Sequence, residues 1–85
     1  MFISSDNIHD LHKIIGQNVK RLRIKNGVSQ LDLTIEIDSK STGFISRCEN
    51  YKDNHHFNIE HLYKIATALN VDMSEFFKDI KTKKD

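Results

Sequence analysis

Apolar residues in the first third of the chain recur at the spacing of one helix face. Four of them fall four, four and three positions apart: Leu11, Ile15, Val19 and Leu22. The positions between them are polar and mostly basic, as on the solvent side of an amphipathic helix. Gly27 follows, and glycine readily takes the left-handed backbone that ends a helix. The pattern therefore predicts one helix over residues 10–25.

The next stretch predicts two short helices joined by a turn. Ser29 can cap the first helix, because its hydroxyl oxygen can accept a hydrogen bond from a free backbone N–H group of the first turn. Residues 38–40 read Asp-Ser-Lys, a composition typical of turns. We expect one helix over residues 30–37 and another that starts at Ser41 or Thr42 and ends at Glu49 or Asn50.

The last third predicts a loop and two further helices. Residues 51–57 show no hydrophobic period, and Asn58 can cap a helix whose apolar residues recur up to Leu69. Asp72 and Glu75 have the spacing of a capping box for a fifth helix. No segment of useful length alternates with a period of two. The sequence therefore predicts an all-α, compact five-helix bundle.

A chain of 85 residues has room for one small domain. We expect an N-terminal arm over residues 1–9, a helical domain over residues 10–80 and a C-terminal tail over residues 81–85. No apolar run reaches the roughly 18 residues of a membrane span, and the first residues lack the basic start of a signal peptide. Cys48 has no second cysteine to pair with, which favours a reducing, cytoplasmic location.

The formal net charge of +1 conceals a basic middle segment. Residues 13–52 hold eight Lys or Arg residues against four acids, a net charge of +4, while residues 1–12 and 53–85 are both net acidic. A basic segment of this kind is a candidate surface for a polyanion, although it is also typical of solvated charges. The charge pattern is therefore compatible with nucleic acid but decides nothing alone.

Two short helices joined by a turn, behind a longer basic helix, are typical of a helix-turn-helix. A helix of about nine residues fits into the major groove of B-DNA, where its N-terminal side chains reach the base edges. The preceding helix braces it and can point its own N-terminus at a phosphate. The arrangement over residues 10–50 therefore predicts a domain that binds double-stranded DNA.

Four segments of the sequence resemble the Cro/repressor-type (XRE-like) helix-turn-helix family. They are residues Ile15–Arg23, Gly27–Gln30, Phe44–Asn50 and Leu62–Val71. The similarity runs from Ile14 to Phe77, about three quarters of the chain. It implies a lambda-repressor-like, five-helix domain and a sequence-specific transcription regulator that acts as a homodimer. Phage-type repressors and the controller proteins of restriction-modification systems are stand-alone members of this size.

The resemblance also implies roles for individual residues. Arg47 is the strongest candidate for reading a base, because a guanidinium group can bond guanine through two hydrogen bonds. Gln30 would bind a phosphate near the start of its helix, whereas Arg23 and Glu49 match a structural ion pair of the family. With two turn residues included, the expected DNA-binding set is Gln30, Lys40, Ser41, Thr42, Gly43, Ser46, Arg47, Asn50 and Lys52.

Several positions depart from the family pattern. Thr34 stands where the family has a small residue, Asp38 where it usually has glycine, and the turn over residues 38–40 is one residue longer than usual. Gly43 offers no side-chain donor in the second short helix and costs about 1 kcal/mol of helix propensity relative to alanine. Ser41 can serve as a cap as well as a contact. The prediction of the fold stands despite these departures, but the DNA sequence that the domain binds cannot be predicted from these residues.

The remaining chemistry-bearing residues do not form a recognisable site. The adjacent His55 and His56 point apart in a loop, and no zinc-finger spacing occurs. His9 and His12 on one helix could bind a metal only weakly, and Cys48 fits a small core residue. No nucleophile with a base, no pair of acids and no Gly-rich phosphate loop is present. We therefore expect no metal, no cofactor, no small-molecule effector and no enzymatic activity.

A homodimer is expected from an apolar stripe in the fifth predicted helix: Met73, Phe77 and Ile80. Two-fold symmetry would then place the two DNA-reading helices about 34–36 Å apart, one turn of B-DNA. The alternative is an antitoxin-like protein-interaction module that keeps the fold and uses its last two helices to hold another protein. The near-neutral total charge favours this alternative slightly.

Overall fold

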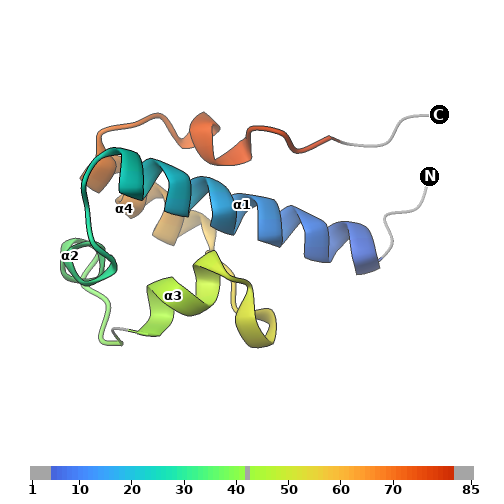
Figure 1. Ribbon diagram of the computed structural model, residues 1–85, viewed down its shortest axis with the longest axis horizontal. Coiled ribbons are helices and arrows are strands. Elements are labelled where there is room, and N and C mark those ends of the chain that lie inside the picture. The colour runs from blue at the N-terminus through green and yellow to red at the C-terminus, as the bar shows by residue number, and fades with distance from the viewer. Residues whose placement is uncertain (1–4, 42, 82–85) are drawn as a thin grey trace.

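The computed structural model describes residues 5–41 and 43–81, a part of the chain that contains helices and turns but no strand. Its elements are α1 (Ser5–Lys25), α2 (Gln30–Glu36), α3 (Gly43–Glu49), α4 (Ile59–Leu69) and two short 3-10 helices, η1 (Lys52–Asn54) and η2 (Met73–Phe77). α1 crosses the length of the molecule, with η2 packed on one side and α3 on the other (Figure 1). None of these helices is long and apolar enough to cross a membrane. The all-α prediction is confirmed.

The helix bounds follow the hydrophobic pattern with one extension. α2, α3 and α4 lie where the sequence predicts helices. α1 begins at Ser5 rather than at residue 10, so that residues 5–9 of the expected arm are helical. Residues 1–4 and 82–85, and Thr42 at the expected start of α3, lie outside the described residues.

One hydrophobic core holds the helices together. Its buried apolar members are Ile15, Val19, Leu22, Leu33, Ile37, Ile45, Cys48, Phe57, Leu62, Ile65, Ala66, Leu69 and Phe76. Three of them are the α1 residues that the spacing placed on one face. Burial raises the pKa of the Cys48 thiol to about 11, so that the thiol stays neutral at physiological pH and packs as a small apolar side chain.

The helices α1 and α3 approach each other closely at Gly16. A Cβ atom at this position would lie 2.5 Å from the backbone oxygen of Cys48 and 2.7 Å from that of Glu49. Any side chain would therefore push the two helices apart, and glycine allows the C-terminal end of α3 to lie directly against α1.

Side-chain caps begin α2 and α4. Ser29 Oγ accepts a hydrogen bond from the Asp32 N–H at 2.9 Å, as predicted. Asn58 Oδ1 accepts from the His61 N–H at 2.7 Å, and the Asn58 N–H donates in turn to His61 Nδ1 at 3.1 Å. His61 thus takes the place of the glutamate or glutamine that usually completes a capping box.

The predicted fifth helix is wrong, because the segment forms only the short 3-10 helix η2 and the described chain has four α-helices. Asp72 makes no side-chain cap bond. Asn18, buried on α1, donates hydrogen bonds to the backbone oxygens of Phe76 at 3.0 Å and Lys78 at 2.9 Å. These carbonyl groups are therefore engaged by α1, and Asp79 has a left-handed φ of 66°, so that no α-helix continues here.

The turn between α2 and α3 accounts for the aspartate at position 38. Asp38 has a φ of 56°, in the left-handed region that glycine adopts most readily and that aspartate tolerates better than most residues. Aspartate thus meets here the conformational requirement that glycine usually meets in the family.

Candidate nucleic-acid interface

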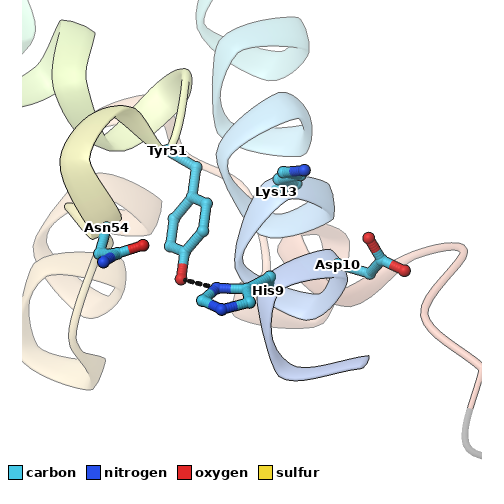
Figure 2. A pocket seen from close by; sticks show the side chains of 5 residues that line it. All are labelled: His9, Asp10, Lys13, Tyr51 and Asn54. Carbon is cyan, nitrogen blue, oxygen red and sulfur yellow. Dashed lines mark hydrogen bonds between the residues drawn. The ribbon is translucent and has the colours of Figure 1, made fainter. Parts of the chain in front are cut away.

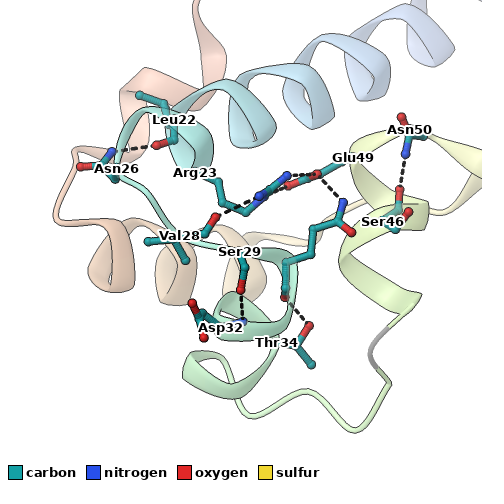
Figure 3. A network of polar contacts seen from close by, with 11 residues as sticks. Leu22, Arg23, Asn26, Val28, Ser29, Asp32, Thr34, Ser46, Glu49 and Asn50 are labelled. Carbon is teal, nitrogen blue, oxygen red and sulfur yellow. Dashed lines mark hydrogen bonds and ion pairs between the residues drawn. The ribbon is translucent and has the colours of Figure 1, made fainter.

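A buried ion pair fixes α3 against α1. Arg23 Nε donates to Glu49 Oε2 at 2.8 Å, and Arg23 Nη2 donates to Glu49 Oε1 at 3.1 Å (Figure 3). Arg23 Nη1 also donates to the backbone oxygen of Val28 at 2.9 Å, so that the guanidinium group also holds the link to α2 just before its capping residue. The two side chains are 8% and 0% exposed. The two-point contact offsets the cost of burying both charges.

Gln30, the first residue of α2, joins the same network. Its Nε2 donates to Glu49 Oε1 at 3.0 Å, so that one carboxylate on α3 binds both α1 and α2. The Gln30 backbone oxygen accepts from the Thr34 hydroxyl at 2.7 Å. Thr34 is buried, and this bond satisfies its hydroxyl where the family has a smaller residue. The network therefore sets the relative positions of α2 and α3.

The helix α3 turns one face to the core and a polar face to solvent. Ile45 and Cys48 are fully buried on the inner face. The described members of the expected DNA-binding set are all exposed or partly exposed: Gln30, Lys40, Ser41, Gly43, Ser46, Arg47, Asn50 and Lys52. They lie on the start of α2, the turn, α3 and the first residues after it, so that the structure gathers them around one helix-turn-helix unit.

The side chain of Arg47 lies back along α3 toward the beginning of the helix. Its Nη2 donates to Ser41 Oγ at 3.2 Å. A Cβ atom on Gly43 would lie 2.5 Å from Arg47 Nη1, which places the guanidinium group directly over the glycine. Helical side chains lean toward the N-terminus of their helix, and Arg47 follows this direction as far as the turn.

Asn50 closes the other end of α3. Its Nδ2 donates to the Ser46 backbone oxygen at 2.8 Å (Figure 3). Three residues of the loop that follows have left-handed φ angles: Tyr51 (50°), Asp53 (51°) and Asn54 (65°). Lys52 lies in this loop, exposed and without an ion pair among the residues that the structure describes. Its ammonium group is therefore available to an external anion.

A solved structure supports the assignment of the fold. No protein-family model matches the chain, and no curated protein matches it. The chain is similar to the crystal structure of the restriction-modification controller protein C.AhdI from Aeromonas hydrophila, with 28% sequence identity, a TM-score of 0.68, and coverage of 80% of this chain and 97% of that chain. The chain has the Cro/repressor-type helix-turn-helix fold. The family resemblance seen in the sequence is confirmed, with α2 and α3 as the helix-turn-helix pair.

Beside the helix-turn-helix lies an aromatic cluster that the sequence did not reveal, where the N-terminal half of α1 meets the loop after α3. His12 stacks on His56 with ring centroids 3.9 Å apart and on Tyr51 at 5.6 Å. His9 Nδ1 forms a hydrogen bond with the Tyr51 hydroxyl (Figure 2). Burial, followed by the charges of His56 and His9, lowers the pKa of His12. The cluster therefore holds the loop against α1, and the lowered pKa of His12 favours the neutral form of that ring.

The same junction contains an open pocket of about 380 Å³, lined by His9, Asp10, Lys13, Tyr51 and Asn54 (Figure 2). Within residues 5–41 and 43–81, no group of three His, Cys, Asp or Glu side chains is placed to hold a metal ion. The clustered histidines stack rather than converge on one point. Local sequence pattern could not place His56 here, because its position depends on the left-handed loop residues.

The three residues expected at a dimer interface do not share one apolar face. Met73 and Ile80 are partly buried against the core, whereas Phe77 is 39% exposed. Other large apolar side chains of the described chain are at least as exposed: Ile8, Ile24, Leu31, Ile35, Ile59 and Tyr63. The apolar surface open to a partner therefore extends beyond the three predicted residues.

Proposed function

We propose that the chain is a sequence-specific DNA-binding transcription regulator of the restriction-modification controller or phage-repressor type. In this proposal α3 lies in the major groove and α2 braces it. The observation that carries it is the network in which the buried pair Arg23 and Glu49 also binds Gln30, because this network holds the two helices together while the polar face of α3 stays partly exposed. The likeness to a controller protein supports the same function.

The exposed residues divide into two kinds of DNA contact. In the proposal, Gly43, Ser46 and Arg47 of α3 contact the base edges, together with Thr42, which lies outside the described residues. The residues that flank this helix contact the sugar-phosphate backbone: Gln30, Lys40, Ser41, Asn50 and Lys52. Phosphate contacts supply affinity that weakens with salt, whereas base contacts supply the choice of sequence.

The regulator binds a two-fold related operator as a homodimer in this proposal, with its α3 helices about 34–36 Å apart. Phe77 stands exposed beside the partly buried Met73 and Ile80, and we place it in the interface. Analytical ultracentrifugation of the Phe77→Glu variant is expected to shift the protein toward monomer. Thr67→Glu, which adds the same charge at an exposed polar position of α4, is the comparison and should leave the oligomeric state unchanged. A wild-type protein that stays monomeric at micromolar concentration removes the dimer.

Selection from random-sequence DNA tests the function directly. We expect a palindromic motif whose binding weakens steeply with salt, and an Arg47→Ala variant that relaxes specificity at one position at a cost of about 1–3 kcal/mol. A selection that returns no motif contradicts the regulator. It favours the antitoxin-like interaction module, for which the exposed Ile59 and Tyr63 of α4 offer a contact surface.

A further inference from the structure

We propose that Gly43 determines DNA specificity by leaving room for Arg47, so that the arginine presents its guanidinium group at the leading end of α3 with Ser41 as its anchor. This inference rests on the proposed DNA binding. It adds to that proposal the residues that aim the base-reading side chain.

The space beside Gly43 is filled by Arg47 itself. A Cβ atom at position 43 would lie 2.5 Å from Arg47 Nη1 and 3.3 Å from Arg47 Cζ, and its third neighbour is Arg47 Nη2. A methyl group at position 43 and the guanidinium group therefore exclude each other. The arginine atoms are the far end of a flexible side chain, so that alanine would displace the guanidinium group and leave the helix in place.

The other two glycines of the chain have different structural reasons. Gly16 lies against the backbone of α3, and Gly27 has a left-handed φ of 70°. Gly43 has no backbone atom among its near contacts and no left-handed φ. Glycine disfavours a helix relative to alanine, and the three nearest atoms that a Cβ at this position would meet all belong to Arg47.

The absence of a side chain at Gly43 determines where along α3 the guanidinium group of Arg47 lies. Arg47 follows Gly43 by four residues, so that the two positions share one helix face. Four residues span roughly 6 Å of helix, and the side chain runs back past Gly43 to form a hydrogen bond with Ser41 Oγ at 3.2 Å, just before the helix begins. The leading end of the second helix is the part that meets the base edges in a helix-turn-helix. Gly43 thus moves the donors of Arg47 from the trailing end of α3 to this leading end.

The anchor leaves the guanidinium group free to read a base. Among the described residues, the guanidinium group of Arg47 makes one side-chain hydrogen bond, from Nη2 to Ser41 Oγ. A guanidinium group carries five N–H donors, and a bidentate contact with guanine uses two of them. Ser41 therefore fixes the direction of the group without consuming its capacity.

A double-mutant cycle of Gly43→Ala and Arg47→Ala tests the inference, with random-sequence selection and competition binding on the wild type, both single variants and the double variant. We expect Arg47→Ala to lower discrimination at one base position by roughly 5- to 150-fold. Gly43→Ala should lower or relocate the same preference. The double variant should behave like Arg47→Ala alone, because the glycine acts only through the arginine.

The controls distinguish a change in the orientation of the Arg47 side chain from a change in the stability of the fold. Gly43→Ala should leave the melting temperature unchanged or raise it, since alanine favours the helix, and Ser41→Ala should weaken the same base preference less strongly. The inference is overturned if Gly43→Ala keeps the wild-type preference, or if it changes the preference equally in the Arg47→Ala background. A motif untouched by Arg47→Ala overturns the inference but keeps the proposed function. A wild-type protein that selects no motif overturns both.

Discussion

At the scale of single residues, the fixed geometry of the helix-turn-helix depends on Glu49. Its carboxylate is buried and accepts hydrogen bonds from Arg23 and Gln30. Glu49→Ala leaves the Arg23 guanidinium group buried without a counter-charge, and we expect it to lower the free energy of unfolding by about 3–5 kcal/mol. Urea unfolding followed by circular dichroism measures this loss.

Two further variants make the Glu49 result specific. Glu36→Ala removes an exposed carboxylate at the end of α2 and should stay within about 0.5 kcal/mol of the wild type. Glu49→Gln keeps an oxygen that can accept from Arg23 but loses the charge, and we expect an intermediate stability. Equal stability of the Glu49→Ala and Glu36→Ala proteins would show that the ion pair is not a principal contact of the fold.

The site residues could be predicted from the sequence as far as the family motif fixes them. The motif pairs Arg23 with Glu49 across 26 residues, and the structure brings the two into contact. The motif says nothing of the space that Gly43 leaves for Arg47, because an arginine rotamer depends on neighbours in three dimensions. The sequence shows only that Gly43 lacks a side-chain donor. Its effect on the path of the Arg47 side chain, four residues later, is visible only in the three-dimensional structure.

At the scale of secondary-structure elements, the close contact of α1 with α3 makes Gly16 a sensitive position. A Cβ atom there would lie 2.5 Å from the Cys48 backbone oxygen, and such overpacking costs about 1–3 kcal/mol. Alanine would regain only about 1 kcal/mol of helix propensity. Because the atoms in the way are backbone atoms of α3, we expect the overpacking to outweigh this gain and Gly16→Ala to lower the urea midpoint. Gln17→Ala, at the exposed neighbouring position, should not. A Gly16→Ala protein more stable than the wild type would contradict the close packing.

The capping box of α4 makes stability depend on pH. Burial, and after it Lys64, lowers the pKa of His61, and Glu60 opposes this shift only in part. The unfolded chain therefore binds protons at higher pH than the folded chain, and stability falls as pH drops through the unfolded pKa of about 6.5. Protonated His61 also cannot accept the hydrogen bond from the Asn58 N–H. Both effects have the same sign.

Urea midpoints at pH 7.5 and 5.5 measure this dependence. His61→Gln keeps a side-chain oxygen at the capping position but does not titrate, so that we expect its midpoint to fall less than that of the wild type on acidification. A residual fall is expected from His12, whose pKa burial also lowers. An identical fall in wild type and variant would exclude His61 as a source of the pH dependence.

The elements were predictable where their signals are local. Ser29 and Asn58 begin α2 and α4 as expected, because a cap lies within one turn of the groups that it satisfies. No fifth α-helix forms; the backbone oxygens of Phe76 and Lys78 instead accept hydrogen bonds from Asn18, 58 and 60 residues away along the chain. A local capping pattern at Asp72 contains no information about such a distant partner.

At the scale of the whole molecule, the fold joins segments that the sequence treats separately. The stack of His12 on His56 ties the N-terminal half of α1 to the loop after α3, and this loop carries Lys52. The contacts that position the helix-turn-helix therefore extend past the two helices to the loop that contains a residue expected to bind phosphate. In the proposed interface, the basic segment over residues 13–52 binds DNA through a few fixed positions as well as through its net charge.

The salt dependence of DNA binding separates these two contributions of charge. If Lys52 binds a phosphate, Lys52→Ala should reduce the slope of log affinity against log salt concentration by about 0.9, while the preferred sequence stays unchanged. Lys64→Ala removes the same charge from the exposed side of α4, outside the proposed interface, and should leave the slope close to that of the wild type. Equal slopes for the two variants would mean that Lys52 contributes only to the overall charge. A changed base preference in Lys52→Ala would instead place its side chain in the groove.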